Sequence, residues 1–108
     1  MSRNDAELIG DALEHLAILH RHLERADLDD GTVAEAVSLR LASAIEALAG
    51  TSDEVRARIS GGRWHAIWAT RNRIAHGYAS IDSAIIRATV ERDLPVLEAA
   101  LQREIRQR

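Results

Sequence analysis

Aliphatic residues recur at every third or fourth position through most of the chain, which is the period of an α-helix with one buried face. The first such stretch covers residues 5–26 and is broken by the acidic turn at residues 27–32. The second covers residues 33–48, and Gly50 marks its end. Thr32 and Glu35 have the spacing of a capping box, so we expect the second helix to begin at Thr32.

The middle of the chain predicts a short helix followed by a long one. Thr51 and Glu54 repeat the capping-box spacing and predict a short helix before the glycine-rich joint at residues 60–62. A third long helix is expected from about Arg63 to Gly77, because glycine ends helices at low conformational cost.

The last helical stretch follows a cap at Ser80 or Asp82 and runs to the end of the chain. Its apolar positions are Ile85, Ile86, Val90, Leu94, Leu97, Leu101 and Ile105. Pro95 lacks a backbone N–H, so this helix must kink or restart near Asp93. Four main helices with short connections predict an all-α fold: an antiparallel four- to five-helix up-down bundle, with residues 1–108 as a single domain.

Composition supports an all-α fold in a reducing compartment. Hydrophobic residues make up 46% of the chain and are almost all Ala, Leu, Ile and Val, with no Phe. The absence of cysteine excludes disulfides and thiolate metal sites. The N-terminus lacks the basic start of a signal peptide, and no stretch approaches the roughly 18 apolar residues of a membrane span. We therefore expect a cytoplasmic protein with no membrane partner.

The charge of the chain is unevenly distributed. The net charge is −3, which argues against a generally basic nucleic-acid binder. Residues 1–54 hold 12 acidic residues and 4 arginines, whereas residues 55–81 hold 5 arginines and no acid. This cationic segment, residues 55–81, can attract a polyanion that the whole-chain charge would repel.

The octet RNRIAHGY, residues 71–78, concentrates chemically active side chains within the cationic segment. It includes Arg71, Asn72, Arg73, His76 and the only tyrosine, Tyr78. One interpretation is an ordinary helix end, in which arginine and histidine complement the helix dipole and the glycine at position 77 stops the helix. Helix geometry gives reasons to weigh a functional interpretation beside it.

Arg71 continues the apolar helix face of Trp64, Ile67 and Trp68. A charge at such a position is costly unless it has a partner or lines a cleft. Asn72 is four residues from His76, so its amide could orient the imidazole on another face of the same helix.

Arg71 and His76 would point about 140° apart on an ideal helix. They converge only if the helix ends at His76 and the chain turns there. An arginine and a histidine together can cleave RNA without a metal, because the guanidinium grips phosphate oxygens and the imidazole, with a pKa of about 6.5, moves a proton. The direction of that proton transfer stays open.

The octet resembles the Arg-x4-His-x-Tyr motif of the HepT-like branch of the HEPN superfamily, small helical ribonuclease toxins of toxin–antitoxin pairs. The resemblance extends to Trp64, seven residues before the motif arginine, and to the segment RDLPVLEAAL at residues 92–101. The N-terminal half fits by its helix pattern, and the segment ASAIEALAG at residues 42–50 lacks the Gly-Glu-Ala run of many members.

The resemblance implies a function for each motif residue. Arg71 and His76 look like the catalytic pair, with Asn72 as the polar residue that follows the motif arginine. Tyr78 looks like the tyrosine to which an MNT-type nucleotidyltransferase antitoxin transfers AMP from ATP. The family also implies a homodimer with a shared cleft, an RNA substrate such as tRNA or mRNA, and no metal or cofactor of its own.

Other features have simpler interpretations, and rival functions stay open. Arg73 is a candidate for binding substrate phosphate or a solvated surface arginine. The histidines His15, His20 and His22 lack the spacing of metal ligands on one helix face. The tryptophans favour packing in the core or at a dimer interface over stacking on bases. The main rival function is a non-catalytic HEPN bundle that binds RNA or a nucleotidyltransferase, and a second is a structural interaction protein.

Overall fold

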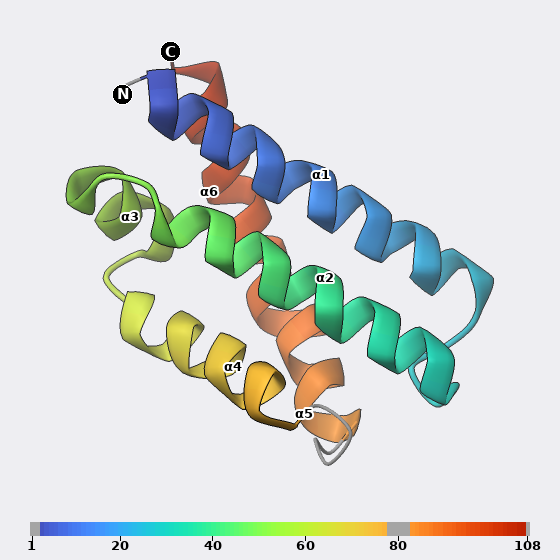
Figure 1. Ribbon diagram of the computed structural model, residues 1–108. Coiled ribbons are helices and arrows are strands. Elements are labelled where there is room, and N and C mark those ends of the chain that lie inside the picture. The colour runs from blue at the N-terminus through green and yellow to red at the C-terminus, as the bar shows by residue number, and fades with distance from the viewer. Residues whose placement is uncertain (1–2, 78–82, 108) are drawn as a thin grey trace.

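The computed structural model describes residues 3–77 and 83–107, which form a bundle of helices (Figure 1). In chain order the elements are α1 (Arg3–Arg25), α2 (Gly31–Ala49), α3 (Asp53–Ser60), α4 (Trp64–Gly77), α5 (Ser83–Ala88), the π-helical turn η2 (Thr89–Asp93) and α6 (Leu94–Arg106). No strand occurs in these two stretches, so the predicted all-α bundle is confirmed. None of the helices described there is long and apolar enough to cross a membrane.

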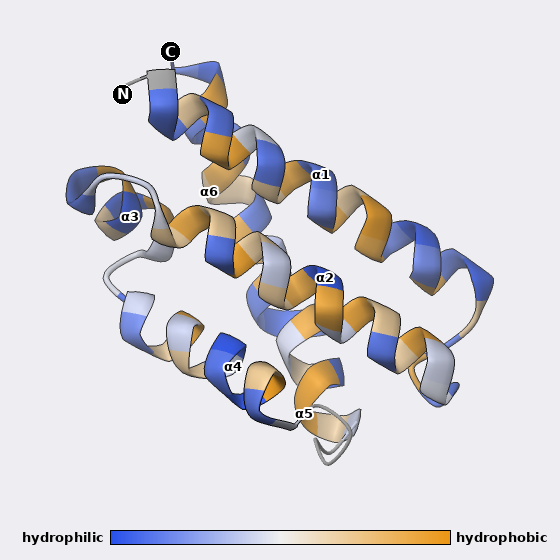
Figure 2. Cartoon of the chain, viewed as in Figure 1, coloured by the Kyte–Doolittle hydropathy of each residue, from blue (hydrophilic) through white to orange (hydrophobic). Residues whose placement is uncertain are grey.

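Helix α2 is central to the bundle. It runs antiparallel to α1 on one side, and α4 lies along its other side (Figure 1). Helix α6 contacts α1 and α3, while α3 also contacts α4. Hydrophobic residues face the space between the helices, and hydrophilic residues cover the outside (Figure 2). Each helix therefore buries one stripe, as the three- and four-residue spacing predicts.

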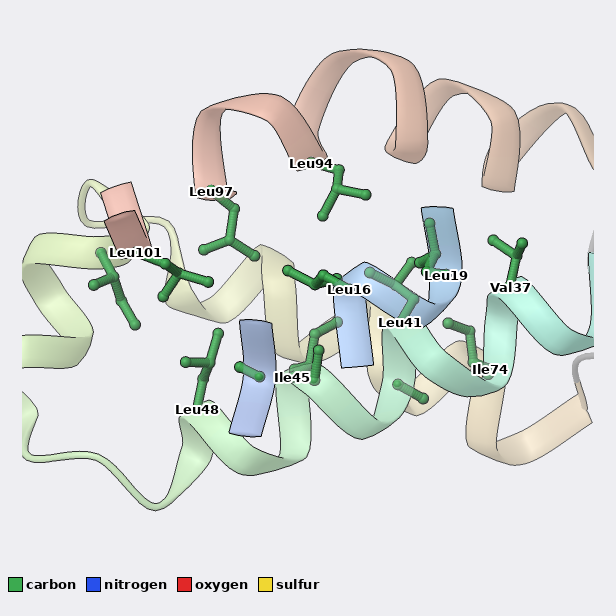
Figure 3. Close-up of a cluster of buried hydrophobic side chains, with 14 of the residues drawn as sticks. Leu16, Leu19, Val37, Leu41, Ile45, Leu48, Ile74, Leu94, Leu97 and Leu101 are labelled. Atoms are coloured by element: carbon green, nitrogen blue, oxygen red, sulfur yellow. The ribbon is translucent and has the colours of Figure 1, made fainter. Parts of the chain in front are cut away.

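The core is made of aliphatic side chains from all six α-helices, and Figure 3 shows part of it. The largest buried side chains are Ile9, Leu16, Leu19, Val37, Leu41, Ile45, Leu48, Val55, Leu94 and Leu101. Helix α4 contributes one buried side chain, Ile74, and three half-buried ones, Trp64, Ile67 and Trp68. This helix is thus attached to the core by a narrow stripe, and most of its other side chains are exposed.

Two helices begin at caps other than those predicted. The cap of α2 is Asp30, whose carboxylate accepts hydrogen bonds from the backbone N–H groups of Thr32 and Val33 at 2.9 and 3.2 Å. The prediction of Thr32 as the cap was therefore wrong, because the acid two residues earlier caps the helix and places Thr32 inside its first turn.

The cap of α3 is Ser52 rather than Thr51. The hydroxyl of Ser52 accepts from the N–H of Val55, whereas the hydroxyl of Thr51 donates backwards to the carbonyl of Leu48 at 2.6 Å. Ser52 is itself held by the buried carboxylate of Asp5, which accepts from its backbone N–H at 2.8 Å and from its hydroxyl at 3.0 Å. One side chain thus links α1 to the start of α3.

The predictions for the second half of the chain are confirmed at both helix breaks that the structure describes. Helix α4 ends at Gly77, and a new helix restarts at Leu94. Pro95 has no backbone N–H to donate. The turn before it, η2, is a π-helix in which the N–H of Leu94 donates to the carbonyl of Thr89. The predicted caps at Ser80 and Asp82 lie outside the described residues.

Ile85 is the one expected apolar position of the last helices that lies outside the core. Its side chain is 40% exposed, whereas Ile86 is buried. Adjacent residues on a helix point about 100° apart, so only one of the two isoleucines can face the core.

An ion-pair cluster fastens α5 to the turn between α1 and α2. The Arg87 guanidinium donates hydrogen bonds to both carboxylate oxygens of Asp27, at 3.1 and 2.7 Å, and to one oxygen of Asp29 at 3.2 Å. Hydrogen bonding to Arg87 holds the pKa of Asp27 well below its ordinary value of 3.8, and the same contact raises the pKa of Arg87. The cluster connects segments about 60 residues apart in sequence.

Candidate functional site

Arg71 projects from α4 toward α2, where it meets a carboxylate. Its Nε donates to Oε1 of Glu46 at 2.8 Å, and Nη2 donates to the same oxygen. Its Nη1 donates to Oδ1 of Asn72 at 3.1 Å. The expectation that a charge on this face needs a partner is thereby satisfied inside one chain, by Glu46.

The guanidinium of Arg71 also lies against an aromatic ring. Its central carbon is 4.8 Å from the centre of the Trp68 ring, a cation–π distance. Trp68 stacks on Trp64 with ring centres 6.0 Å apart and an angle of 26° between the planes. Arg56 covers Trp64 at 5.5 Å. We call this row, Arg56, Trp64, Trp68 and Arg71, the α4 ladder.

At the end of the α4 ladder opposite Arg71, Arg56 is held by backbone carbonyl groups. Nη1 of Arg56 donates to the carbonyl oxygens of Ala49 and Thr51 at 2.8 and 2.9 Å. Each tryptophan therefore lies between a cation and the other ring. The ladder thus links the α2–α3 junction to Arg71 through a row of contacts.

His76 is exposed in the last turn of α4. Because α4 continues unbroken to Gly77, Arg71 and His76 stay on one regular helix, where a five-residue spacing separates them by about 140°. Within residues 71–77 the chain makes no turn that would bring the two together. In the described contacts the amide oxygen of Asn72 accepts from Arg71, which differs from the expected contact with the imidazole.

One further predicted site residue, Arg73, is not brought to Arg71. Arg73 is exposed and points about 200° around the helix from Arg71. Tyr78 lies outside the described residues.

Glu46 is the site residue that sequence reasoning missed. It is 25 residues from Arg71, so no local spacing connects them. One signal was present: Glu46 is the only acid between residues 36 and 52, and helices 2 and 4 of an up-down bundle can be neighbours. Its carboxylate is half-exposed, whereas the Arg71 side chain that it contacts is less exposed.

A groove of about 180 Å³ lies on another side of α4, between this helix and the start of α6. Its floor is aliphatic, with Ile45 from α2, Ile67 from α4 and Leu97 from α6 among the lining residues. Arg63 and Asp93 lie at its edge. Neither Arg71 nor His76 lines this groove, so it is separate from the α4 ladder.

The histidines of α1 contact two different helices. Nδ1 of His15 accepts from Arg40 on α2 at 3.1 Å, and Nε2 of His20 lies 2.8 Å from Glu98 on α6. Over residues 3–77 and 83–107, no group of three or more His, Cys, Asp or Glu side chains is arranged to hold a metal ion. His15 and His20 each join α1 to another helix through one contact.

Comparison with known proteins gives one match. A family model described as Ribonuclease HepT-like covers residues 9–104, from the first turns of α1 nearly to the end of α6. No curated protein and no solved structure matches the chain. The matched region includes the whole α4 ladder, Glu46 and the octet at residues 71–78.

Proposed function

The chain belongs to the HepT-like ribonuclease family, and from this membership we propose that it is a metal-independent endoribonuclease and the toxin of a toxin–antitoxin pair. The observation that carries the proposal is the family match over a chain that retains Arg71, His76 and Tyr78 at the motif spacing. The cationic segment supplies the charge that an RNA backbone requires.

In the proposed reaction the RNA supplies its own nucleophile. The 2′-hydroxyl attacks the adjacent phosphorus, the bond to the 5′-oxygen breaks, and a 2′,3′-cyclic phosphate and a 5′-hydroxyl form. Arg71 binds the phosphate oxygens and stabilises the charge that develops on them. His76 transfers a proton either from the nucleophile or to the leaving oxygen. No protein-bound metal takes part in any of these steps.

The divergence of Arg71 and His76 on α4 supports a site shared between two chains. We propose a homodimer in which the arginine of one protomer and the histidine of its partner act on one phosphate. The exposed surface of α4 supports this arrangement, because Ile74 is its only buried side chain and the exposed Ala69 lies on the same helix face as His76. Small side chains let two helices approach closely.

Regulation is proposed to act through Tyr78. A nucleotidyltransferase antitoxin would transfer AMP from ATP: the phenolic oxygen attacks the α-phosphorus, and pyrophosphate leaves. The added phosphate is anionic and two residues from His76, so it would repel the RNA backbone. Co-expression with the product of a neighbouring gene should add one AMP to the intact mass, and Tyr78→Phe should abolish the addition. An addition that survives this change would exclude Tyr78.

The ribonuclease proposal is tested by incubating labelled RNA with purified protein in a metal chelator. Wild type should cleave, His76→Ala should lose activity with its fold and dimer intact, and His65→Ala should retain it. His65 is a matched control, because it is an exposed histidine on nearly the same side of α4. Binding without cleavage by the wild type would refute the proposal and support a non-catalytic RNA-binding bundle.

A further inference from the structure

The contacts of Arg71 divide its guanidinium into a side edge that Glu46 holds and a terminal edge that Glu46 leaves open. A guanidinium carries five N–H donors in one plane. Glu46 accepts from Nε and Nη2, which form the side edge, and Asn72 accepts from Nη1. Among the described residues, three of the five donors therefore have acceptors. The other two belong to Nη1 and Nη2, the nitrogens of the terminal edge.

We propose that Arg71 offers this terminal edge to the phosphate, and that Glu46 and Trp68 are positioning residues that fix the edge in place. The proposal rests on the ribonuclease function proposed above. A phosphate binds a guanidinium most strongly through two parallel N–H···O bonds from one edge. Because Glu46 occupies the side edge, the terminal edge is where two such bonds can form without displacing Glu46.

Trp68 limits the movement of the guanidinium. The ring centre lies 4.8 Å from the central guanidinium carbon, and the ring stacks on Trp64, which Arg56 covers in turn. The Arg71 side chain is 26% exposed, so most of its length is packed. An arginine held in this way has already lost most of its rotamer freedom before a phosphate arrives.

Glu46 has opposite effects on binding and on turnover. Its negative charge weakens the attraction of Arg71 for a ground-state phosphate. The two hydrogen bonds that it accepts fix the orientation of the guanidinium. This orientation matters most in the transition state, when extra negative charge develops on the phosphate oxygens. A positioning role therefore predicts a separation of kinetic constants that a purely structural role would not produce.

The first test observes Arg71 directly and needs no enzymatic activity. In ¹⁵N NMR spectra the Nε–H signal of Arg71, assigned by its loss in Arg71→Lys, should exchange slowly with water in the wild type. Trp68→Leu and Glu46→Ala should accelerate that exchange, whereas Trp64→Leu, which removes a ring that does not touch Arg71, should do so less. An Arg71 signal that is the same in all four proteins would overturn the positioning roles.

The second test adds a short 2′-O-methyl RNA, which cannot be cleaved by its own 2′-oxygen. Binding should shift the Nη signals of Arg71 while the Nε–H stays protected, because Glu46 keeps the side edge. Loss of Nε–H protection on binding would mean that phosphate displaces Glu46, and the edge assignment would be wrong.

The third test is kinetic. Trp68→Leu should lower kcat/KM about tenfold and Trp64→Leu clearly less, while Trp68→Phe, which keeps an aromatic face, should restore most of the loss. Glu46→Gln should lower kcat with an unchanged or smaller KM. If Trp68→Leu and Trp64→Leu lower kcat/KM equally at matched stability, Trp68 only packs against its neighbours and the positioning role is wrong. If no protein cleaves RNA, the ribonuclease proposal fails, and the NMR comparison still decides whether Arg71 is positioned.

Discussion

Arg71 was identifiable from the sequence as a charge on an apolar helix face, but its partner was not. The helical period places it beside Trp64 and Trp68, and desolvation then requires a compensating group. That group, Glu46, comes from a helix whose neighbours are decided by packing of the whole bundle. Helix periodicity thus locates a functional residue within its own helix, whereas the contacts that orient it are tertiary.

Asp5 offers a test of a buried contact far from the candidate site. Its carboxylate is 4% exposed and accepts from both the N–H and the hydroxyl of Ser52. Asp5→Ala should lower the free energy of unfolding by about 1–3 kcal/mol, because the Ser52 donors lose their acceptor and the α3 cap loosens. Urea denaturation measures the change. Asp11→Ala, at an exposed position of α1, should change stability by less than about 0.5 kcal/mol, and an equal loss in both variants would contradict the assignment.

The sequence predicted that the long helices exist and how long they are, because the aliphatic periodicity extends over many residues. The first residue of each helix was harder to predict, because several neighbouring polar side chains can act as the cap. Asp30 supersedes Thr32, and Ser52 supersedes Thr51, since each reaches the orphan donors of the first turn directly. The π-helical turn at Thr89–Asp93 could be anticipated only as a break near Pro95.

The end of α3 depends on a left-handed residue. Gly61 has φ 59° and ψ 32°, a conformation that side-chain-bearing residues adopt at a cost. Gly61→Ala should destabilise the protein by about 1 kcal/mol even though a methyl group there would meet open space. Gly31→Ala is the matched control at the start of α2, also in open space, and should be neutral or slightly stabilising. Thermal unfolding of both variants measures the two changes in stability. A Gly61→Ala variant as stable as the wild type would contradict the role of the left-handed conformation.

The attachment of α5 to the α1–α2 turn should depend on pH. The folded pKa of Asp27 is depressed by Arg87, so the stabilisation is complete above the ordinary value of 3.8 and is lost as the pH falls below it. The difference in unfolding free energy between wild type and Asp27→Asn should therefore be larger at pH 7 than at pH 3. Chemical denaturation at both pH values measures it. A difference that grows on acidification would refute the ion-pair account, and Asp11→Asn should show little pH-dependent difference.

The whole molecule, in the proposed dimer, makes a prediction that no single helix can. If Arg71 of one protomer acts with His76 of its partner, mixed dimers of Arg71→Ala and His76→Ala chains contain one intact site and one doubly defective site. Two inactive preparations, exchanged at equal amounts, should then recover about a quarter of wild-type cleavage, since half of the dimers are mixed. Recovery measured after partial denaturation and refolding tests this. No recovery despite confirmed mixed dimers would place both residues of each site in the same chain.

The stacked tryptophans give the molecule an optical property of practical use. Both indoles of the chain belong to α4, so ultraviolet fluorescence excited at the red edge of absorption originates entirely beside Arg71. Far-ultraviolet circular dichroism, by contrast, averages over every helix. Helix α4 fully buries only Ile74, so it should detach before the other helices unfold. The tryptophan fluorescence should therefore change before the circular dichroism signal is lost. Comparing the two spectroscopic transitions during unfolding would show whether the candidate site melts separately from the bundle that supports it.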